Sequence, residues 1–282
     1  MATPNTGSTL ARQSDGTIQV TFSLPWRDVE KIQEHVIAEE GEKVTIPGFR
    51  RGKAPISKIK EKITSSTLIE KTLSHFYSFF ISDIINNHKI KPAIYPRIEV
   101  LKALDNDDWQ VRAITCELPK IVLGDYRKTI LEKVKTSPKK ELTREEKEQT
   151  VLKVLVESIK IEIPKLLITE EANQRLSGLL ARIEKLGLQL ESYLTSIGKD
   201  IEKLRLDYDH QARNAIAIEL ILGEIADKEG VLADDNQIEE AIKAASAGDS
   251  EAEKRLSTPE QKNIIKNVLQ RRTVLDSLLA LV

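Results

Sequence analysis

The chain opens with an alternating pattern of apolar and polar residues and then changes to helical spacing. After a turn signal at Asp15 and Gly16, four apolar side chains occupy every second position and predict a half-buried strand: Ile18, Val20, Phe22 and Leu24. Pro25 then opens a predicted amphipathic helix that ends at Gly41. The change of period indicates a domain that mixes strands with helices.

Further helices and a strand pair are predicted before residue 120. Ile56, Ile59 and Ile63 indicate a short helix, and a longer one follows whose apolar positions share one face: Ile69, Leu73, Phe76, Phe80 and Ile84. Segments 94–101 and 109–118 then have the pattern of two strands joined by a turn at residues 105–108. We therefore predict an α+β domain over residues 1–120, with a small sheet, long helices and a loop between helices.

The apolar spacing is helical throughout from residue 141 onward. Thr143 and Glu146 predict a capping box, and Gly187 and Gly230 predict the ends of two long helices. Residues 121–140 have weak periodicity and are predicted to be a linker with its hinge at residues 138–140. An elongated all-α domain is therefore expected over residues 141–282.

Composition adds limits on the core and on the compartment. Charged residues make up 31% of the 282 residues and aromatic ones 4%, so the core has to consist mainly of Leu, Ile and Val. The lone Cys116 cannot form an internal disulfide, which favours a reducing compartment. Neither a secretory signal nor a transmembrane stretch is recognised. We therefore expect a cytoplasmic protein.

The densest charge lies between the first two predicted helices. Residues 42–62 contain seven Lys or Arg against two Glu, in a chain whose formal net charge is −1. Within this stretch, Phe49, Arg50, Arg51 and Lys53 are set among two glycines and two prolines, which predicts a shaped, exposed loop. Such a concentration of cations is typical of a surface that binds phosphate or an acidic partner.

This loop does not fit a nucleotide-binding P-loop. That motif needs four residues between its glycines and a Ser or Thr after the Lys, whereas three residues separate Gly48 from Gly52 and Ala54 follows Lys53. The loop resembles instead the G-F-R-x-G-K-x-P ribosome-docking motif of trigger factor, a bacterial chaperone family of the ribosomal exit tunnel. The matching positions run without a gap through Gly48, Phe49, Arg50, Gly52, Lys53 and Pro55, and Arg51 adds a cation at the variable position.

The resemblance to trigger factor extends to the rest of the chain. The order of elements over residues 17–118 is similar to the ribosome-binding domain of that family, and residues 161–164 and 220–225 resemble landmarks of its helical chaperone domain. Full-length members carry a prolyl-isomerase domain between these parts, whereas the 121–140 bridge is too short to hold any folded domain. The resemblance therefore implies a shortened member that lacks the isomerase and is not an enzyme.

No constellation for catalysis or metal binding stands out in the sequence. The four histidines lack the spacing of a metal site: His35, His75, His88 and His210. The aspartates at 105, 107 and 108 lack the Gly and distal Glu of a calcium loop and are predicted to form a turn. Cys116 is predicted to be a small core residue. We expect no cofactor and no bound metal.

The resemblance implies an ATP-independent chaperone that docks near the ribosomal exit tunnel. The docking residues would be Gly48, Phe49, Arg50, Arg51, Gly52, Lys53 and Pro55, facing ribosomal protein and RNA, while the helical domain would shield apolar segments of unfolded or nascent polypeptides. Neither DNA nor a membrane is an expected partner, and a homodimer of the free protein stays open.

Three alternatives remain beside this interpretation. A basic turn with Phe49 packed into the core is disfavoured, because closely spaced cations repel one another unless a partner binds them. A general RNA-binding module would need aromatics interleaved with the cations, and Phe49 is the single one there. A ribosome-independent holdase or assembly factor fits the sequence equally well.

Overall fold

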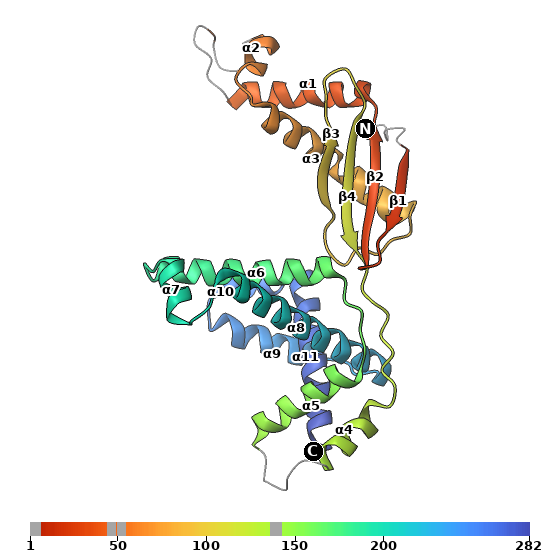
Figure 1. The fold of residues 1–282 in the computed structure, drawn as a ribbon, viewed down its shortest axis with the longest axis vertical. Helices are drawn as coiled ribbons and strands as arrows, with labels where there is room; N and C mark the ends of the chain where they lie inside the picture. The colour runs from red at the N-terminus through yellow and green to blue at the C-terminus, as the bar shows by residue number, and fades with distance from the viewer. Residues whose placement is uncertain (1–6, 44–48, 50–54, 136–142) are drawn as a thin grey trace. The chain divides into compact units, whose positions relative to one another are not determined.

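The structure is a computed structural model that describes residues 7–43, 49, 55–135 and 143–282. The chain divides into two compact units (Figure 1). The first comprises Met1–Leu118 together with Pro164–Leu167, and the second comprises Pro119–Ile163 and Ile168–Val282. The predicted hinge at residues 138–140 lies outside the described residues, and the domain limits set from the sequence stay a prediction.

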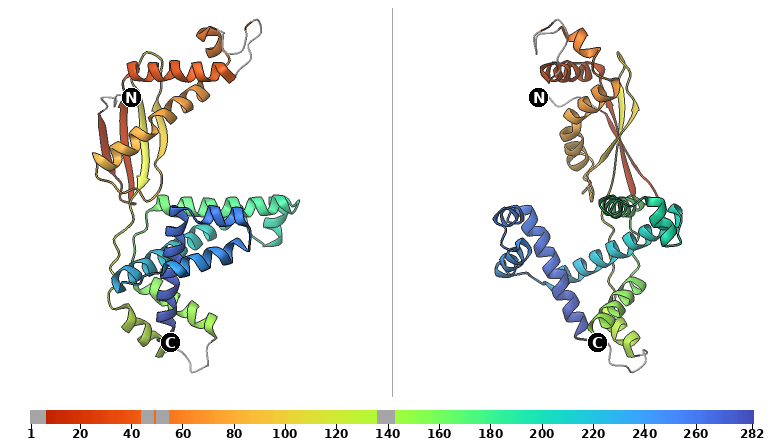
Figure 2. Two further views of the ribbon diagram at one scale, coloured as in Figure 1. Left: turned by 180° about the vertical axis from the view of Figure 1, so that it is seen from behind. Right: turned by 90° about the vertical axis from the view of Figure 1, so that its left-hand side faces the viewer.

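The first unit is an α+β unit built on a four-stranded antiparallel sheet. Its strands are β1 (Ser8–Arg12), β2 (Thr17–Leu24), β3 (Arg97–Lys102) and β4 (Trp109–Cys116), in the spatial order β1-β2-β4-β3. Its helices are α1 (Trp26–Lys43), α2 (Ile56–Lys60) and α3 (Ser65–Asn86). Helix α3 lies across one face of the sheet, and α1 lies on that same side (Figure 2).

The core of the first unit forms where α3 meets the sheet. The alternating residues of β2 all point inward, as predicted, and α3 buries Leu73, Phe76, Phe80 and Ile84 against them. The ring centroids of Phe22 and Phe80 are 4.7 Å apart, so two aromatic side chains join the helix to the sheet. The α+β class predicted for this part of the chain is therefore confirmed.

Two features of the first unit differ from the prediction. Strand β1 was not predicted, because its five residues are mostly exposed and show no apolar alternation. The prediction that α1 ends at Gly41 is wrong, since the helix continues to Lys43 and Gly41 is buried within it. This glycine serves close packing of α2 and not helix termination.

The second unit is all helical in its described part, as the sequence predicted. Its helices are α4 (Tyr126–Lys135), α5 (Arg144–Ser158), α6 (Lys165–Lys185, whose first three residues group with the first unit), α7 (Leu190–Ser196), α8 (Ile201–Glu229), α9 (Asp235–Ser246), α10 (Ser250–Leu256) and α11 (Pro259–Leu279). Thr143 and Glu146 form the predicted capping box, and Gly230 ends α8 in the left-handed conformation. Helices α5, α8 and α11 share one core, whose fully buried side chains include Leu155, Ile221 and Leu278.

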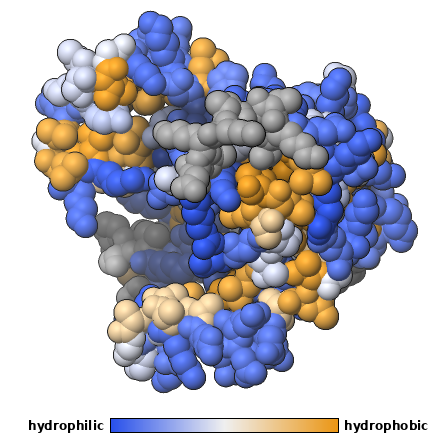
Figure 3. Space-filling view, turned by 90° about the horizontal axis from the view of Figure 1, so that it is seen from below, coloured by the Kyte–Doolittle hydropathy of each residue, from blue (hydrophilic) through white to orange (hydrophobic). Residues whose placement is uncertain are grey.

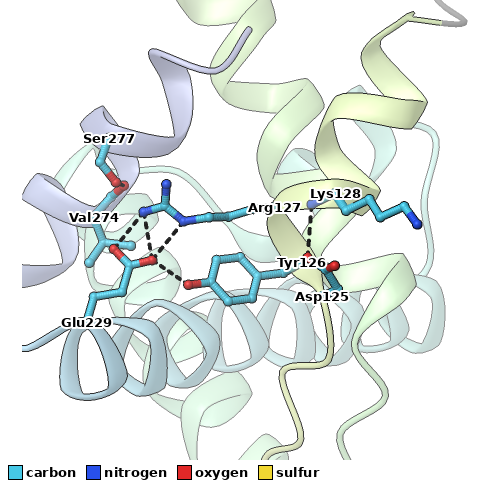
Figure 4. Close-up of polar contacts among 7 residues, drawn as sticks. All are labelled: Asp125, Tyr126, Arg127, Lys128, Glu229, Val274 and Ser277. Carbon is cyan, nitrogen blue, oxygen red and sulfur yellow. Dashed lines mark hydrogen bonds and ion pairs between the residues drawn. The ribbon is translucent and has the colours of Figure 1, made fainter.

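The segment predicted to be a linker contains helix α4, which packs into the second unit. Tyr126 and Ile130 are buried in the helical core. The Tyr126 hydroxyl donates a hydrogen bond to Glu229 at the end of α8, and Arg127 donates to both carboxylate oxygens of Glu229 at 2.8–3.0 Å (Figure 4). The Lys228 ammonium lies 5.5 Å from the centre of the Tyr126 ring. Helix α4 is thus tied to α8 by packing, hydrogen bonds and charge.

The charges at this contact shift the ionisation of both partners. Burial and the hydrogen bond to Glu229 raise the pKa of Tyr126. Burial acts to raise the pKa of Glu229, but the hydrogen bonds from Tyr126 and Arg127 outweigh it, and the pKa of Glu229 lies below its ordinary value. The ionised carboxylate therefore stabilises the folded state.

No described helix combines the length and the apolar character needed to cross a lipid bilayer.

We predict that Glu229→Gln lowers the free energy of unfolding by about 1 kcal/mol at neutral pH, because the charge-assisted bonds from Arg127 are weakened. The folded-state pKa of Glu229 is depressed, so its contribution is complete above the unfolded-state pKa and is lost as the pH falls through the folded-state value. The difference between parent and variant should therefore shrink below about pH 4.

Denaturant unfolding followed by circular dichroism at several pH values measures this difference. Glu132→Gln is the matched control, because Glu132 lies on α4 in a long, exposed 3.9 Å pair with Lys128 and should contribute nothing measurable. A Glu229 variant as stable as the parent at pH 7 would contradict the prediction.

Candidate functional site

The predicted docking residues lie between α1 and α2. Two of the seven, Phe49 and Pro55, are described by the structure, and both are exposed. The other five lie outside the described residues: Gly48, Arg50, Arg51, Gly52 and Lys53. The Phe49 residue exposes 43% of its surface, which does not fit the alternative of a basic turn with Phe49 packed into the core. A role for these residues in docking stays a prediction.

A second apolar cluster, which we call the loop-base cluster, lies beneath the ends of this loop. It consists of the buried residues Val36 and Ile37 from α1, Ile59 from α2 and Leu68 from α3. Ile32 and Ile63 pack against it from the periphery. Three helices therefore meet directly at the loop ends, and the segment on each side of the loop is held in place by its own buried contacts.

Ion pairs close the loop-base cluster at its edge. The Glu40 carboxylate on α1 accepts hydrogen bonds from Lys71 on α3 at 2.6 Å and from Lys43 at 2.9 Å. These two ammonium groups, Lys71 most strongly, lower the pKa of Glu40. The charge at Glu40 therefore supports the approach of α1 to α3.

The acidic turn between β3 and β4 contacts both helices that flank the loop. The Asp108 carboxylate accepts a hydrogen bond from the Trp26 backbone N–H at 2.9 Å, which caps the start of α1. Asp105 pairs with Lys60 on α2 at 3.2 Å. The prediction of a turn is confirmed by the course of the chain, whereas its contacts with α1 and α2 had no signal in the sequence, because they join residues 45 to 82 positions apart.

Three of the four described cations of the basic stretch have acidic partners. Lys43 pairs with Glu40, Lys58 with Glu61, and Lys60 with Asp105. Their contribution to an outer phosphate-binding surface is therefore smaller than the raw count of cations indicates. Binding of an acidic partner would therefore depend mainly on the cations of the loop itself, Arg50, Arg51 and Lys53.

Two apolar hollows lie along α3 in the first unit. The larger, of about 660 Å³, is lined mainly by Ile69, Leu73, Tyr77, Ile98 and Val100, with Glu70 among its lining residues. The smaller, of about 360 Å³, lies between the second half of α3 and residues 92–96. The Tyr77 hydroxyl donates to the Pro96 carbonyl oxygen at 3.2 Å and so ties α3 to the segment before β3.

Exposed apolar side chains are spread over the second unit. They include Leu180, Leu186, Leu188, Ile197, Ile201 and Leu206 on the segment from α6 to α8, with Val122 and Leu131 before it and Leu232, Ile264 and Val268 further along the chain. Figure 3 shows hydrophobic areas separated by hydrophilic residues.

One cluster in the first unit has the residue types of a hydrolase triad without its geometry. The Ser8 hydroxyl donates to Asp83 at 2.8 Å and lies 2.9 Å from His88 Nε2, while that same nitrogen lies 3.3 Å from Asp83. A triad needs the serine and the carboxylate on opposite ring nitrogens. The cluster therefore ties β1 to the end of α3 and does not form a nucleophile.

The remaining candidates for chemistry are the other histidines and the single cysteine. The rings of His35 and His75 are 5.7 Å apart, and among the described residues no group of three or more metal-ligating side chains is found. Cys116 is fully buried, as predicted, and burial raises the pKa of its thiol to about 11. At neutral pH this thiol stays protonated and unreactive.

The fold and the site together define a class: an α+β unit in which three helices meet at the ends of the predicted docking loop, followed by a helical unit. Comparison with known proteins gives the family. A family model described as bacterial trigger factor protein matches residues 8–154, and one described as its C-terminus matches residues 123–280. Each covers more than half of the chain, so the chain belongs to the trigger factor family. The two matched ranges overlap, so no further domain stands between them.

Individual relatives agree with this assignment. The chain is 31% identical to a trigger factor of Clostridium botulinum (strain Kyoto / Type A2) over 110 residues, which cover 38% of this chain and 26% of the relative. It is 28% identical to that of Ruminiclostridium cellulolyticum over 156 residues, which cover 54% and 36%. The matches thus span about a quarter to a third of the length of these relatives.

A solved trigger factor structure has the same fold. It comes from work on promiscuous substrate recognition in folding and assembly activities of that chaperone. The TM-score is 0.64 at 13% sequence identity, over 97% of this chain and 99% of that one.

Proposed function

We propose that this protein is an ATP-independent chaperone that docks near the ribosomal exit tunnel and shields apolar segments of nascent chains. The observation that carries the proposal is the exposed Phe49 within an uninterrupted docking motif, in a chain that belongs to the trigger factor family. Docking is assigned to residues 1–120 and client binding to residues 141–282.

Docking would combine an apolar contact with several charged ones. Phe49 is exposed at a loop whose ends are fixed, so it can enter a small apolar pocket of a partner without unfolding the unit. Arg50 and Arg51 would pair with carboxylates or phosphates, for which the planar guanidinium group is suited. Lys53 would add a further positive charge, while Gly48, Gly52 and Pro55 shape the loop.

Client binding would use the exposed apolar residues of the second unit. Burial of apolar surface contributes about 25 cal/mol per Å² before the cost of ordering is subtracted, so several scattered contacts give weak and reversible binding. Such binding has broad specificity because it is not directional. Release would follow when the client buries its own apolar residues.

A ribosome-independent holdase or assembly factor is the second candidate, since the exposed apolar residues of the second unit would serve it equally. The two candidates differ in the use of the loop, and ribosome binding separates them. The RNA-binding module is disfavoured because three of the described cations near the loop are already paired with carboxylates.

We predict that replacing Phe49, Arg50 and Arg51 together by Ala weakens ribosome binding at least about tenfold and makes the residual binding less dependent on salt, because counterion release is lost. Cosedimentation with purified ribosomes between about 50 and 200 mM salt measures both effects. The matched control replaces Tyr95, Lys91 and Lys120, all exposed, by Ala and thus removes one aromatic and two cationic side chains elsewhere. If the loop variant stays folded and still cosediments like the parent, the docking proposal is wrong.

We predict that replacing Leu186, Leu188 and Ile201 by Ser reduces suppression of client aggregation at least twofold without ATP, because these side chains expose 72%, 51% and 60% of their surface. Light scattering of a diluted, denatured client measures the effect. The control replaces Leu10, Leu101 and Leu104, exposed in the first unit, by Ser. Equal protection by both variants would contradict the assignment of client binding to the helical unit.

We predict that the protein does not accelerate prolyl isomerisation, because the isomerase domain of the family has no place between the two matched parts of this chain. Refolding of a client limited by proline isomerisation takes tens of seconds or longer without a catalyst. Faster refolding at substoichiometric protein would show that the chain carries an isomerase site after all.

A further inference from the structure

Gly41 of α1 lies in direct contact with Ile59 of α2. A Cβ atom placed on Gly41 would stand 2.5 Å from Ile59 Cδ1 and 3.3 Å from its Cγ1, and the first distance is shorter than real Cβ contacts. Glycine weakens a helix relative to alanine, so this position has a residue that is unfavourable for α1 alone. What the glycine permits is a close approach of the Ile59 side chain to the backbone of α1, which a larger residue would oppose.

The Ile59 side chain has little freedom to move away. It is 5% exposed and is enclosed by Val36, Ile37 and Leu68 of the loop-base cluster. In a close-packed protein interior, an increase in the volume of one side chain displaces its neighbours and their backbone. A larger side chain at position 41 would therefore push on α2 itself.

This contact is placed where the loop begins and ends. Gly41 is two residues before the end of α1 at Lys43, and Ile59 is three residues after the start of α2 at Ile56. Residues 44–55 connect these two ends. The distance between Gly41 and Ile59 therefore determines how far apart the two ends of the loop lie.

Further contacts hold each helix from its other side. Glu40 binds Lys71 of α3, and Lys60 pairs with Asp105 of the β3–β4 turn. Helices α1 and α2 are thus fixed to the body of the first unit, and the Gly41–Ile59 contact determines how closely they approach each other.

We propose that Gly41 and Ile59 are positioning residues of the docking loop: their contact fixes the separation of the loop ends and so holds the loop ready to bind. This inference rests on the proposed docking function. A loop whose ends are held at the binding separation loses less conformational freedom on binding, and affinity rises accordingly.

Two pairs of substitutions that conserve the number of side-chain carbons test the inference. Gly41→Ala adds one carbon and Ile59→Val removes one, namely Cδ1, the atom nearest to the added Cβ. Gly41→Val adds three carbons and Ile59→Ala removes three. The first pair is mild enough to keep the fold, and Gly41→Ala also favours the helical state of α1.

We expect each substitution of Gly41 alone to weaken ribosome binding, and the matching substitution of Ile59 to restore it. Gly41→Ala should weaken ribosome binding by about two- to threefold and Gly41→Val by about tenfold, while each double variant should return to within about twofold of the parent. Loss of affinity by Gly41→Ala without loss of stability separates positioning from general damage.

The separation of the loop ends is measured independently. Spin labels on Lys43→Cys and Lys58→Cys report the distance between the ends by pulsed electron resonance, and the buried Cys116 stays unlabelled. We expect a longer distance in Gly41→Val and the parent distance in Gly41→Val with Ile59→Ala.

Three results would overturn the inference: parent affinity in Gly41→Val, an unchanged distance between the labels in that variant, or no recovery in the mild pair. The loop variant with Phe49, Arg50 and Arg51 replaced by Ala is run beside them. If that variant binds like the parent, the proposed docking function fails; if it loses binding while the Gly41 series does not, the positioning role alone fails.

Discussion

The packing of α3 across the sheet is the interaction on which the first unit depends. Phe76 and Phe80 pack against β2 in the main core, and the first turn of the same helix contributes Leu68 to the loop-base cluster. One helix therefore serves both the main core and the base of the loop. The loop-base cluster is therefore held in place partly by a core whose residues lie away from it, since a close-packed interior permits little independent movement.

In the helical unit, α8 is the helix on which the core depends, as α3 is in the first unit. Its apolar side chains contact α5 and α11, and its last residue, Glu229, receives Tyr126 and Arg127 from α4. These contacts lie toward the end of α8, whereas Ile201 and Leu206 near its start are exposed. Surface left open in this way is available for binding without any change of fold.

Much of the fold could be predicted from the sequence because local signals decided it. The alternation in β2 and the cap at Thr143 each reflect the chemistry of a few neighbouring residues. Strand β1 gave no such signal, since its side chains are mostly exposed and the backbone of β2 determines its pairing. Gly41 was misread because glycine permits both a helix end and a close approach, and only the position of Ile59 decides between them. The loop motif could be recognised because its residues are contiguous in the sequence. The contacts that support the loop join distant residues, so the sequence did not predict them.

The tie between Arg127 and Glu229 joins residues 102 positions apart in the sequence. A carboxylate in the last turn of a helix is unfavourable beside the negative end of the helix dipole, so α8 relies on α4 to compensate this charge. Synthesis proceeds from the N-terminus, and α4 leaves the ribosome long before Glu229 exists. During that interval Tyr126 lacks its partner Glu229, and the core that buries Tyr126 and Ile130 still lacks α8 and α11. The growing chain is then itself an unfinished polypeptide with exposed apolar residues, subject to the same hazard of premature association as any other newly made protein.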